Sequence, residues 1–286
     1  PDLIIFKYWI PFLAPSFRSI IKRTNKKISV KSLVICDNII PHENRPFDKF
    51  LTKSFFKHID HFIVMSKSVE KDLLFLFPDA KYIYTPHPLY DIFGKCNKKD
   101  KSKRYLQIHE NKVILFFGLI RPYKGLDLLI EASKTLKEKL NNFKILVVGD
   151  CYENPEPYSK MINKNGLNDI FDMRFEFVPN DKVNIYFSAA DVIVLPYKSA
   201  TQSGIVPVAY HFDKPVIVTN VGGLSEIVQE GKTGYVVYPE PNEIADGILK
   251  YYNNSDKINF VENIKSYKDN FTWNKFIEKI ERIFIQ

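Results

Sequence analysis

From residue 112 onward, short apolar runs alternate with segments of helical periodicity. The runs are continuous stretches of Val, Ile, Leu and Phe rather than apolar residues at every second position. That is the pattern of strands buried on both faces of a parallel sheet. We predict strands over residues 113–117, 144–148, 175–178, 191–195, 215–219 and 234–237. Residues 126–140 and 181–189 have the periodicity of helices, so this part of the chain is predicted to be a doubly wound α/β domain.

The first 93 residues repeat this alternation less completely. We predict strands over residues 3–7, 31–35, 61–65 and 81–85, and helices near residues 15–23, 48–57 and 68–77. The segment Ser66-Lys67-Ser68 resembles the N-cap of the third helix, because it precedes the run Val69–Leu74 with Glu70 and Asp72 in the first turn. Four strands make a thin sheet, and the first begins within a few residues of Pro1. We interpret this part as an incomplete, N-terminally truncated Rossmann-like domain.

The fold class expected from these patterns is α/β, with two Rossmann-like doubly wound domains. Residues 1–94 are assigned to the partial first domain and residues 111–270 to the second. Residues 95–110 include the run KCNKKDKSKR and are predicted to be a basic, solvated linker. Residues 271–286 are predicted to be an amphipathic helix suited to packing against another domain.

The net charge and the spacing of the cysteines restrict the kinds of ligand and partner that this chain is expected to bind. Of the 286 residues, 41 are Lys or Arg and 33 are Asp or Glu, a formal net charge of +8 that favours anionic partners. Much of the excess falls in the basic linker, so we do not predict nucleic-acid binding. No apolar run reaches the roughly 20 residues that a bilayer requires. The three cysteines lack metal-ligand spacing, so we expect reduced thiols in a cytoplasmic protein, with no metal site and no cofactor.

Three polar segments each follow a predicted strand of the second domain. The first runs from Gly118 to Gly125 and carries Arg121 and Lys124. Two cations three residues apart, before a helix N-terminus, can grip a diphosphate. An exposed basic turn that ends in Gly125 is the alternative.

The second segment joins the strand at 191–195 to an apolar helical stretch at 205–212. It contains Tyr197, Thr201, Gln202, Ser203 and Gly204, whose hydroxyl, amide and backbone N–H groups suit phosphate or sugar oxygens. Thr201 or Ser203 could equally serve only as a helix N-cap.

The third segment contains Gly222 and Gly223, between a strand and a predicted helix that includes Glu226. Paired glycines permit close approach of a ligand to the backbone, or simply a tight turn. Since all three segments lie at the carboxyl edge of one sheet, together they predict a nucleotide site there.

The first domain offers fewer candidates. Asp37, His42 and Arg45 follow the strand at 31–35 and are assigned to the acceptor side. His42 could orient an acceptor or a phosphate, although a loop histidine is often only solvated. Residues 6–12, with the cations of residues 18–23, could lie on an anionic membrane surface or could instead belong to a hydrophobic core.

These motifs carry a family resemblance. In order, FGLIRPYKGLDLLIEA, ILVVGD, ADVIVLPY and SATQSGIVPVAYHFDKPVIVTNVGGLSEIVQEGKTGYVV closely resemble retaining glycosyltransferases of family four, which have the GT-B architecture. The resemblance covers residues 112–286, including the helix FTWNKFIEKI that in this family crosses back to the first domain. It also covers residues 1–93 as the latter part of the acceptor domain.

The resemblance implies transfer of a sugar from a nucleoside diphosphate to a hydroxyl acceptor, without a metal, in glycan, polysaccharide or glycolipid synthesis. Arg121 and Lys124 would then neutralise the leaving diphosphate. The residues expected to bind the donor are Gly118, Gly125, Tyr197, Thr201, Gln202, Ser203, Gly204, Gly222 and Gly223. The enzyme would be cytoplasmic, either throughout or in peripheral contact with the inner face of the membrane.

The sequence also departs from the family pattern. The arginine that often follows the glycine directly is replaced here by Leu119, and Ala200 and Val208 occupy the positions of a common glutamate pair. A catalytically silent nucleotide-sugar-binding or scaffold subunit is therefore an alternative, as is a nucleotide-sugar epimerase. A starch-type phosphorylase is disfavoured, because no lysine stands in the context that its pyridoxal cofactor requires.

Overall fold

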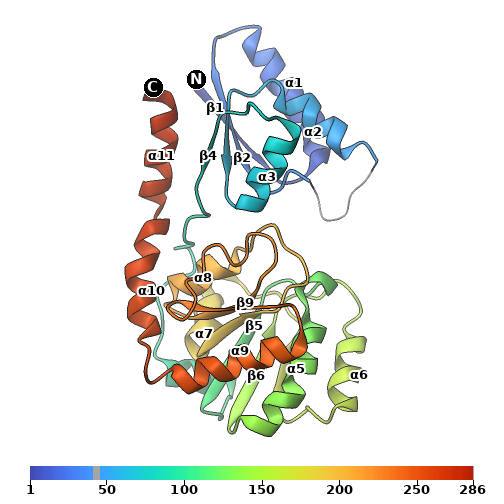
Figure 1. Ribbon diagram of the computed structural model, residues 1–286, viewed down its shortest axis with the longest axis vertical. Helices are drawn as coiled ribbons and strands as arrows, with labels where there is room; N and C mark the ends of the chain where they lie inside the picture. Colours follow the sequence, from blue (N-terminus) through green and yellow to red (C-terminus); the bar gives the residue numbers. More distant parts are fainter. Residues whose placement is uncertain (41–45, 286) are drawn as a thin grey trace. The chain divides into compact units, whose positions relative to one another are not determined.

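The computed structural model describes residues 1–40 and 46–285, and the chain divides into two compact units (Figure 1). Unit 1 comprises Pro1–His87, Ala200–Gln202 and Trp273–Gln286, and unit 2 comprises Pro88–Ser199 and Ser203–Thr272. Each unit contains one parallel β-sheet. Among the described residues, no helix combines the length and the apolar character needed to cross a bilayer.

Unit 1 is built on a four-stranded sheet in the order β1-β2-β3-β4. The strands are β1 (Leu3–Tyr8), β2 (Lys31–Cys36), β3 (His61–Val64) and β4 (Tyr82–Tyr84). The helices between them are η1 (Pro11–Leu13), α1 (Ala14–Asn25), α2 (Asp48–Phe56) and α3 (Lys67–Leu76). An N-cap was predicted within Ser66-Lys67-Ser68, and the structure shows that it is Ser66, whose hydroxyl accepts a hydrogen bond of 3.2 Å from the Val69 N–H.

Both faces of this sheet are covered, which explains why its strands are continuously apolar. Val34 and Phe62 belong to the core that the sheet forms with α1, α2 and α3. Their neighbours Leu33 and Ile63 point to the other face, where they pack with Phe276 of α11 (Trp273–Ile285). The amphipathic C-terminal helix thus completes the core of unit 1.

Unit 2 is built on a six-stranded parallel sheet in the order β10-β9-β8-β5-β6-β7. The strands are β5 (Lys112–Phe117), β6 (Phe143–Val148), β7 (Phe171–Arg174), β8 (Val192–Leu195), β9 (Val216–Thr219) and β10 (Gly234–Val237). From β5 the chain first adds β6 and β7 on one side and then returns to add β8, β9 and β10 on the other. The strand order therefore reverses between β5 and β8.

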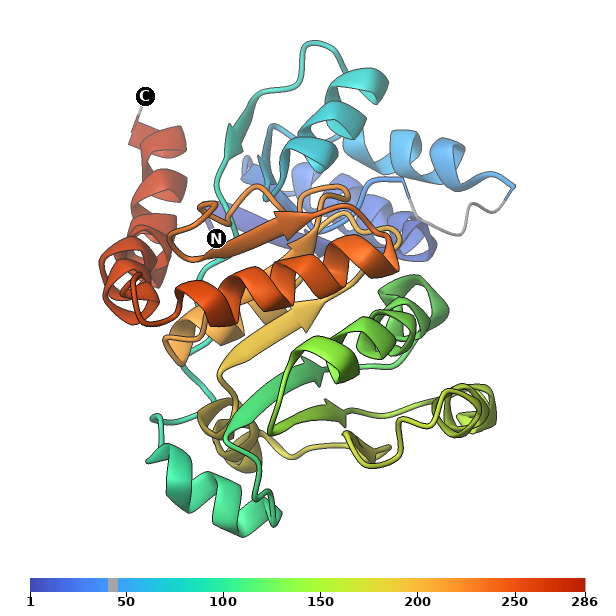
Figure 2. The ribbon, with the colours of Figure 1, turned by 60° about the horizontal axis from the view of Figure 1, so that its bottom comes forward.

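Helices cover both faces of the second sheet. They are α4 (Lys99–Leu106), η2 (Pro122–Lys124), α5 (Leu126–Lys139), α6 (Glu156–Lys164), α7 (Asn180–Ala189), α8 (Ile205–His211), α9 (Pro241–Asn254), α10 (Phe260–Lys268) and η3 (Asp269–Phe271). Helices α5, α6 and α9 share one core with the sheet (Figure 2). On the other face, the Phe117 ring lies 5.0 Å from that of Phe187 in α7, which stacks on Phe212 after α8. The prediction of two Rossmann-like α/β domains is confirmed.

Three local predictions were wrong. The strand expected at residues 175–178 is instead β7, at Phe171–Arg174. Strand β7 is at the edge of the sheet, where polar residues are tolerated, and Arg174 pairs with Asp172 at 2.7 Å. The supposed linker contains helix α4, which packs against α7 with Ser102 and Leu106 buried. The helix expected directly after Gly223 is not formed, because residues 224–227 form bends and turns.

Candidate functional site

Gly118, Gly125 and Tyr197 lie in unit 2, where strands β5 and β8 end side by side. Gly118 directly follows β5, and Tyr197 comes two residues after the end of β8. These strands are neighbours in the sheet, although α5, β6, α6, β7 and α7 separate them in sequence. In open α/β sheets, ligands bind beyond the carboxyl ends of the strands where the strand order reverses. Gly118 and Tyr197 are therefore at the position where sheets of this kind bind ligands.

Gly125 holds these two turns close together. Its backbone has a φ of +70°, and a Cβ atom at this position would lie 1.9 Å from the Pro196 carbonyl oxygen. A side chain would clash with the backbone, so only glycine allows the turn after β5 to approach β8 this closely. The Lys198 N–H donates a hydrogen bond of 2.7 Å to the Tyr123 carbonyl oxygen across the same contact.

Lys124 is the most unusual charged residue of this edge. Only 9% of the residue is exposed, and its Nζ lies 5.6 Å from the centroid of the Tyr197 ring. Within the described part of the chain, no hydrogen bond or ion pair to its ammonium is found. Burial, and to a lesser extent the nearby charge of Arg121, lowers the pKa of Lys124 to about 8. A buried cation without a carboxylate partner is stabilised by an anionic ligand.

The ammonium of Lys124 lies next to Gly118. A Cβ atom at Gly118 would lie 3.4 Å from Lys124 Nζ and 3.3 Å from the side chain of Ile205, and Gly118 has a φ of +109°. The missing side chain therefore leaves the backbone of Gly118 close to the cation. The Gly118 N–H donates to the Val148 carbonyl at 2.9 Å, so it is already used by the neighbouring strand.

Arg121 points toward the loop that follows β6. Its Nη1 lies 3.3 Å from the Glu153 carboxylate, and its guanidinium lies 5.3 Å from the centroid of the Tyr152 ring. The ion pair engages one end of a guanidinium that has five N–H donors. Tyr152 and Glu153 were not predicted as site residues, although both follow the motif ILVVGD at the same sheet edge.

The loop after β8 is fixed from several sides. The Thr219 hydroxyl donates to the Tyr197 carbonyl at 2.6 Å, and Lys198 pairs with Asp127 at 2.5 Å. Burial raises the pKa of the Tyr197 phenol, whose oxygen lies 3.3 Å from Ser203 Oγ. Ser203 Oγ also accepts a hydrogen bond of 3.2 Å from the Ile205 N–H. Ser203 therefore supports the first turn of α8, as its alternative role required.

Other predicted donor residues are placed differently. Thr201 and Gln202 belong to unit 1, where the Thr201 hydroxyl bonds the Asn38 side chain and Gln202 Nε2 donates to Asp37 at 3.1 Å. Gly204 precedes α8, and a Cβ atom there would lie 3.2 Å from the Tyr90 hydroxyl oxygen. Gly222 is exposed with a φ of +50°, whereas Gly223 is buried.

On the acceptor side, only Asp37 can be located, because His42 and Arg45 lie outside the described residues. The Asp37 carboxylate pairs with Lys7 of β1 at 3.0 Å. Lys7 was not identified from the sequence, since nothing in the pattern indicated that its side chain would meet Asp37.

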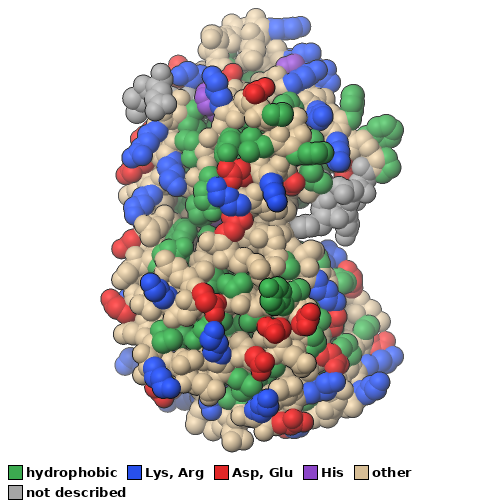
Figure 3. All heavy atoms as spheres, in the orientation of Figure 1, with side chains coloured by type: hydrophobic (Ala, Val, Ile, Leu, Met, Phe, Trp, Pro, Cys, Tyr) green, Lys and Arg blue, Asp and Glu red, His purple; other side chains and the backbone are tan. Residues whose placement is uncertain are grey.

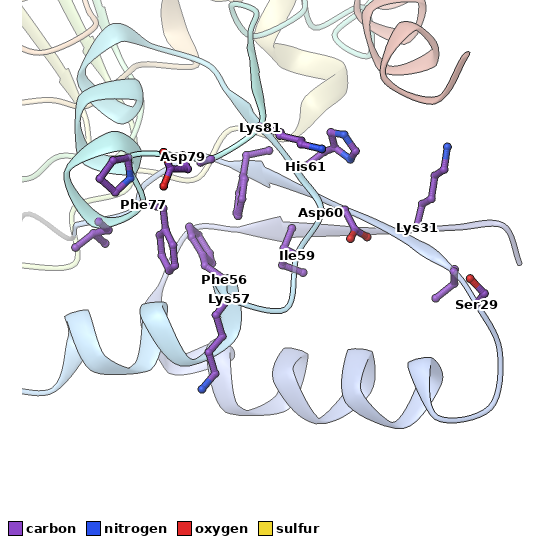
Figure 4. A pocket seen from close by; sticks show the side chains of 15 residues that line it. Ser29, Lys31, Phe56, Lys57, Ile59, Asp60, His61, Phe77, Asp79 and Lys81 are labelled. Carbon is purple, nitrogen blue, oxygen red and sulfur yellow. The ribbon is translucent and has the colours of Figure 1, made fainter. Parts of the chain in front are cut away.

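A separate cavity of about 640 Å³ opens at the amino ends of β2, β3 and β4 in unit 1 (Figure 4). Its lining includes Lys31, Asp60, His61 and Lys81, and it contains none of the predicted site residues. The Asp60 carboxylate accepts hydrogen bonds from the Ser32 N–H at 2.8 Å and hydroxyl at 2.7 Å, which gives it a structural role. Burial lowers the pKa of His61. In residues 1–40 and 46–285, no group of three or more His, Cys, Asp or Glu side chains is placed to hold a metal.

Comparison with known families agrees with this architecture. Residues 97–270 match the family model described as Glycosyl transferases group 1. An uncharacterized glycosyltransferase of Methanocaldococcus jannaschii is 31% identical over 173 residues, which cover 59% of this chain and 47% of that protein. The lipopolysaccharide 1,2-N-acetylglucosaminetransferase of Salmonella typhimurium is 27% identical over 198 residues, which cover 65% of this chain and 52% of that protein. The chain thus spans about half the length of these two relatives.

Solved structures extend the comparison to nearly the whole fold. Anabaena HepE in complex with UDP superposes with a TM-score of 0.80 at 18% identity, covering 98% of this chain and 78% of that one. Sucrose-phosphate synthase from Thermosynechococcus elongatus gives a TM-score of 0.79 at 18% identity, covering 100% of this chain and 73% of that one. The predicted GT-B fold class is confirmed.

Proposed function

We propose that this chain, which belongs to the glycosyl transferases group 1 family, transfers a sugar from a nucleoside-diphosphate donor to a hydroxyl acceptor with retention of anomeric configuration. The observation that carries the proposal is the ammonium of Lys124. It is buried at the point where the strand order reverses, and no carboxylate of the described residues neutralises it. A diphosphate would supply the charge that this environment lacks.

The proposed chemistry is electrostatic. As the bond between the sugar and the diphosphate breaks, negative charge grows on the leaving oxygen, and a fixed cation stabilises that transition state more than the ground state. Lys124 is assigned this role. Arg121 is proposed to contribute through those of its N–H groups that Glu153 does not engage.

The described residues suggest no side-chain nucleophile at this edge, so we assign no covalent intermediate. The departing diphosphate would instead accept the proton of the acceptor hydroxyl, whose oxygen attacks the anomeric carbon on the same face of the sugar. We further propose that transfer needs no divalent metal, because two cations already offset the diphosphate charge.

One solved structure of the same fold supports the proposed donor class, and one relative supports the proposed pathway. HepE, which has the same fold, was solved with UDP. The Salmonella relative is named for transfer of N-acetylglucosamine to lipopolysaccharide, so we propose a role in glycan, polysaccharide or glycolipid synthesis. Gly118 gives the diphosphate access to Lys124, and Ser203 and Gly204 lie at the start of α8 for further contacts.

A second candidate is a binding subunit without transferase activity. Ala200 and Val208 occupy the positions of the glutamate pair common in related enzymes, and both are buried apolar side chains. Such a subunit would bind nucleotide sugars at the same edge but would turn over none of them.

The test has a binding arm and a turnover arm. Calorimetry with UDP, GDP and ADP should show binding of at least one nucleotide, and Lys124→Gln should weaken that binding by about 10- to 100-fold. Lys137→Gln, which removes a surface ion pair with Asp169, serves as the matched control and should bind normally. Transfer from the corresponding nucleotide sugar, with and without a chelator, then separates enzyme from binding subunit. Absence of nucleotide binding to the unmodified chain would refute both candidates.

A further inference from the structure

Four phenylalanines of unit 1 are unusually exposed. The exposed fractions are 78% for Phe12, 76% for Phe47, 67% for Phe50 and 70% for Phe75. A single exposed apolar side chain needs no explanation, but several on one surface commonly mark a membrane or protein contact. These four come from η1, from α2 and its N-cap, and from α3, which belong to the same helical layer of unit 1.

Contacts between these elements place η1 against α2 and Phe75 of α3 beside Lys49 of α2. Helix η1, which carries Phe12, packs against α2. The Lys49 ammonium of α2 lies 5.5 Å from the centroid of the Phe75 ring of α3. We call the surface formed by Phe47, Lys49, Phe50, Lys53, Lys71 and Phe75 the α2–α3 face. Figure 3 shows hydrophobic side chains beside Lys and Arg side chains where α2 lies.

Helical spacing explains how phenylalanine and lysine share this face. Lys49 and Lys53 are four residues apart on α2, and Phe50 lies between them. All three are exposed, whereas Thr52, Phe55 and Phe56 are buried against the sheet. On α3, Lys71 and Phe75 are also four residues apart and exposed.

Positive charge continues from this face onto α1. Residues 11–30 contain five Lys or Arg and no Asp or Glu. The pKa of His58, after α2, is lowered first by burial and then by the charges of Lys22, Lys57 and Arg18. The cations of α1 therefore lie near the C-terminal end of α2. Asp48 stands in the first turn of α2, where a carboxylate stabilises the helix dipole.

We propose that the α2–α3 face, extended by the cations of α1, binds the surface of an anionic lipid bilayer. The phenylalanine side chains would insert between headgroups, while the lysines and arginines contact lipid phosphates. A bilayer interface accepts projecting aromatic side chains without a matching groove, and the excess of positive charge selects anionic lipids. For residues 6–12, a membrane contact and a core position were both open from the sequence; Phe6 and Tyr8 belong to the core, whereas Phe12 is exposed.

Exposed apolar residues on the first strand are left out of this surface. Ile5 lies on β1, an edge strand of the described sheet, and such an edge can pair with a further strand. The α2–α3 face consists of helix surfaces, and its exposure does not depend on that edge.

The test is co-sedimentation of the unmodified chain with vesicles. It should bind vesicles of phosphatidylcholine with phosphatidylglycerol, bind phosphatidylcholine alone at least about tenfold more weakly, and lose binding at high salt. Lys49→Gln and Lys53→Gln should each lower the partition coefficient about fivefold, which corresponds to about 1 kcal/mol per cation. Phe47→Ser with Phe50→Ser should lower it by about tenfold or more.

Two control variants in unit 2 test whether vesicle binding depends on the α2–α3 face. Phe177→Ser removes a phenylalanine of unit 2 that is 72% exposed, and Lys137→Gln removes a lysine of unit 2. Both should bind vesicles like the unmodified chain, and circular dichroism should show that all variants are folded. Equal binding to both kinds of vesicle would overturn the proposal, as would binding that the phenylalanine variants leave unchanged. Sedimentation without vesicles, or capture of an acidic protein in place of vesicles, would also overturn it. No sugar transfer is measured, so this outcome is independent of the proposed function.

Discussion

At the residue scale, the ammonium of Lys124 couples ligand binding to pH. In the unliganded protein its pKa is lowered to about 8, by burial first and then by Arg121. Above that pH the cation is lost, so a diphosphate must bind together with a proton. We predict that UDP affinity falls as pH rises from 8 to 9.5, and that one proton is taken up on binding in this range. Calorimetry in buffers of different ionisation enthalpy measures both quantities.

The lowered pKa of Lys124 also determines how the stability of the folded chain changes with pH. Because the pKa of Lys124 is lower in the folded than in the unfolded chain, the unfolded chain binds more protons between about pH 8 and 10.4. The contribution of Lys124 to the folding free energy therefore becomes more favourable as pH rises through that window. Lys124→Gln should remove both pH effects. Nucleotide affinity that is flat from pH 7 to 9.5 in the unmodified chain would contradict the assignment.

Arg121 and Lys124 are expected to act on one ligand. Charged hydrogen bonds of this kind contribute roughly 1.5–3 kcal/mol each, so Arg121→Ala and Lys124→Ala should each lower kcat/KM by about 10- to 100-fold. The double variant should lose less than the product of the two effects. Arg121→Lys should recover only part of the activity, since an ammonium cannot make a forked contact. Normal kinetics in Arg121→Ala, with Lys124→Ala inactive, would show that Arg121 serves only its contact with Glu153.

At the element scale, Gly125 is required for the approach of two loops. Gly125→Ala would have both a φ of +70° and a clash with the Pro196 carbonyl oxygen. Gly231 offers a matched control, because its φ is +69° and nothing lies within 4 Å of its added Cβ. Gly231→Ala should cost only the conformational term, about 1 kcal/mol. Gly125→Ala should lower the melting temperature further and weaken nucleotide binding. Equal melting temperatures for the two variants would refute this role.

The elements also show how far the sequence could predict the site. The strands were predictable because their apolar runs are buried on both faces, and strand order then placed Gly118 and Tyr197 together. The position of strand β7 was not predicted, because an edge strand tolerates polar residues such as Asp172 and Arg174, which interrupt the apolar run. The contact of Arg121 with Glu153 and Tyr152 depends on the path of a loop, which apolar periodicity does not encode. For the same reason, the sequence did not place Thr201 and Gln202 with unit 1.

At the scale of the whole molecule, the two units have separate cores, and that of unit 1 includes a helix from the far end of the chain. Phe276 of α11 is buried against Leu33 and Ile63. We predict that Phe276→Ala destabilises unit 1 by about 3–5 kcal/mol, the usual range for removal of a buried phenylalanine. Hydrogen exchange should therefore accelerate at the amides of β2 and β3.

The neighbouring residue separates loss of packing from loss of helix. Ile277 lies on the same helix but is 47% exposed, so Ile277→Ala should change exchange in β2 and β3 much less than Phe276→Ala does. Strands β5 and β6 belong to the other core, and their exchange should stay unchanged in both variants, because a cavity in one core does not remove contacts from the other. Equal acceleration in β2 and β5 after Phe276→Ala would show that the units unfold as one cooperative body. No acceleration at either strand would show that α11 contributes little to the stability of unit 1.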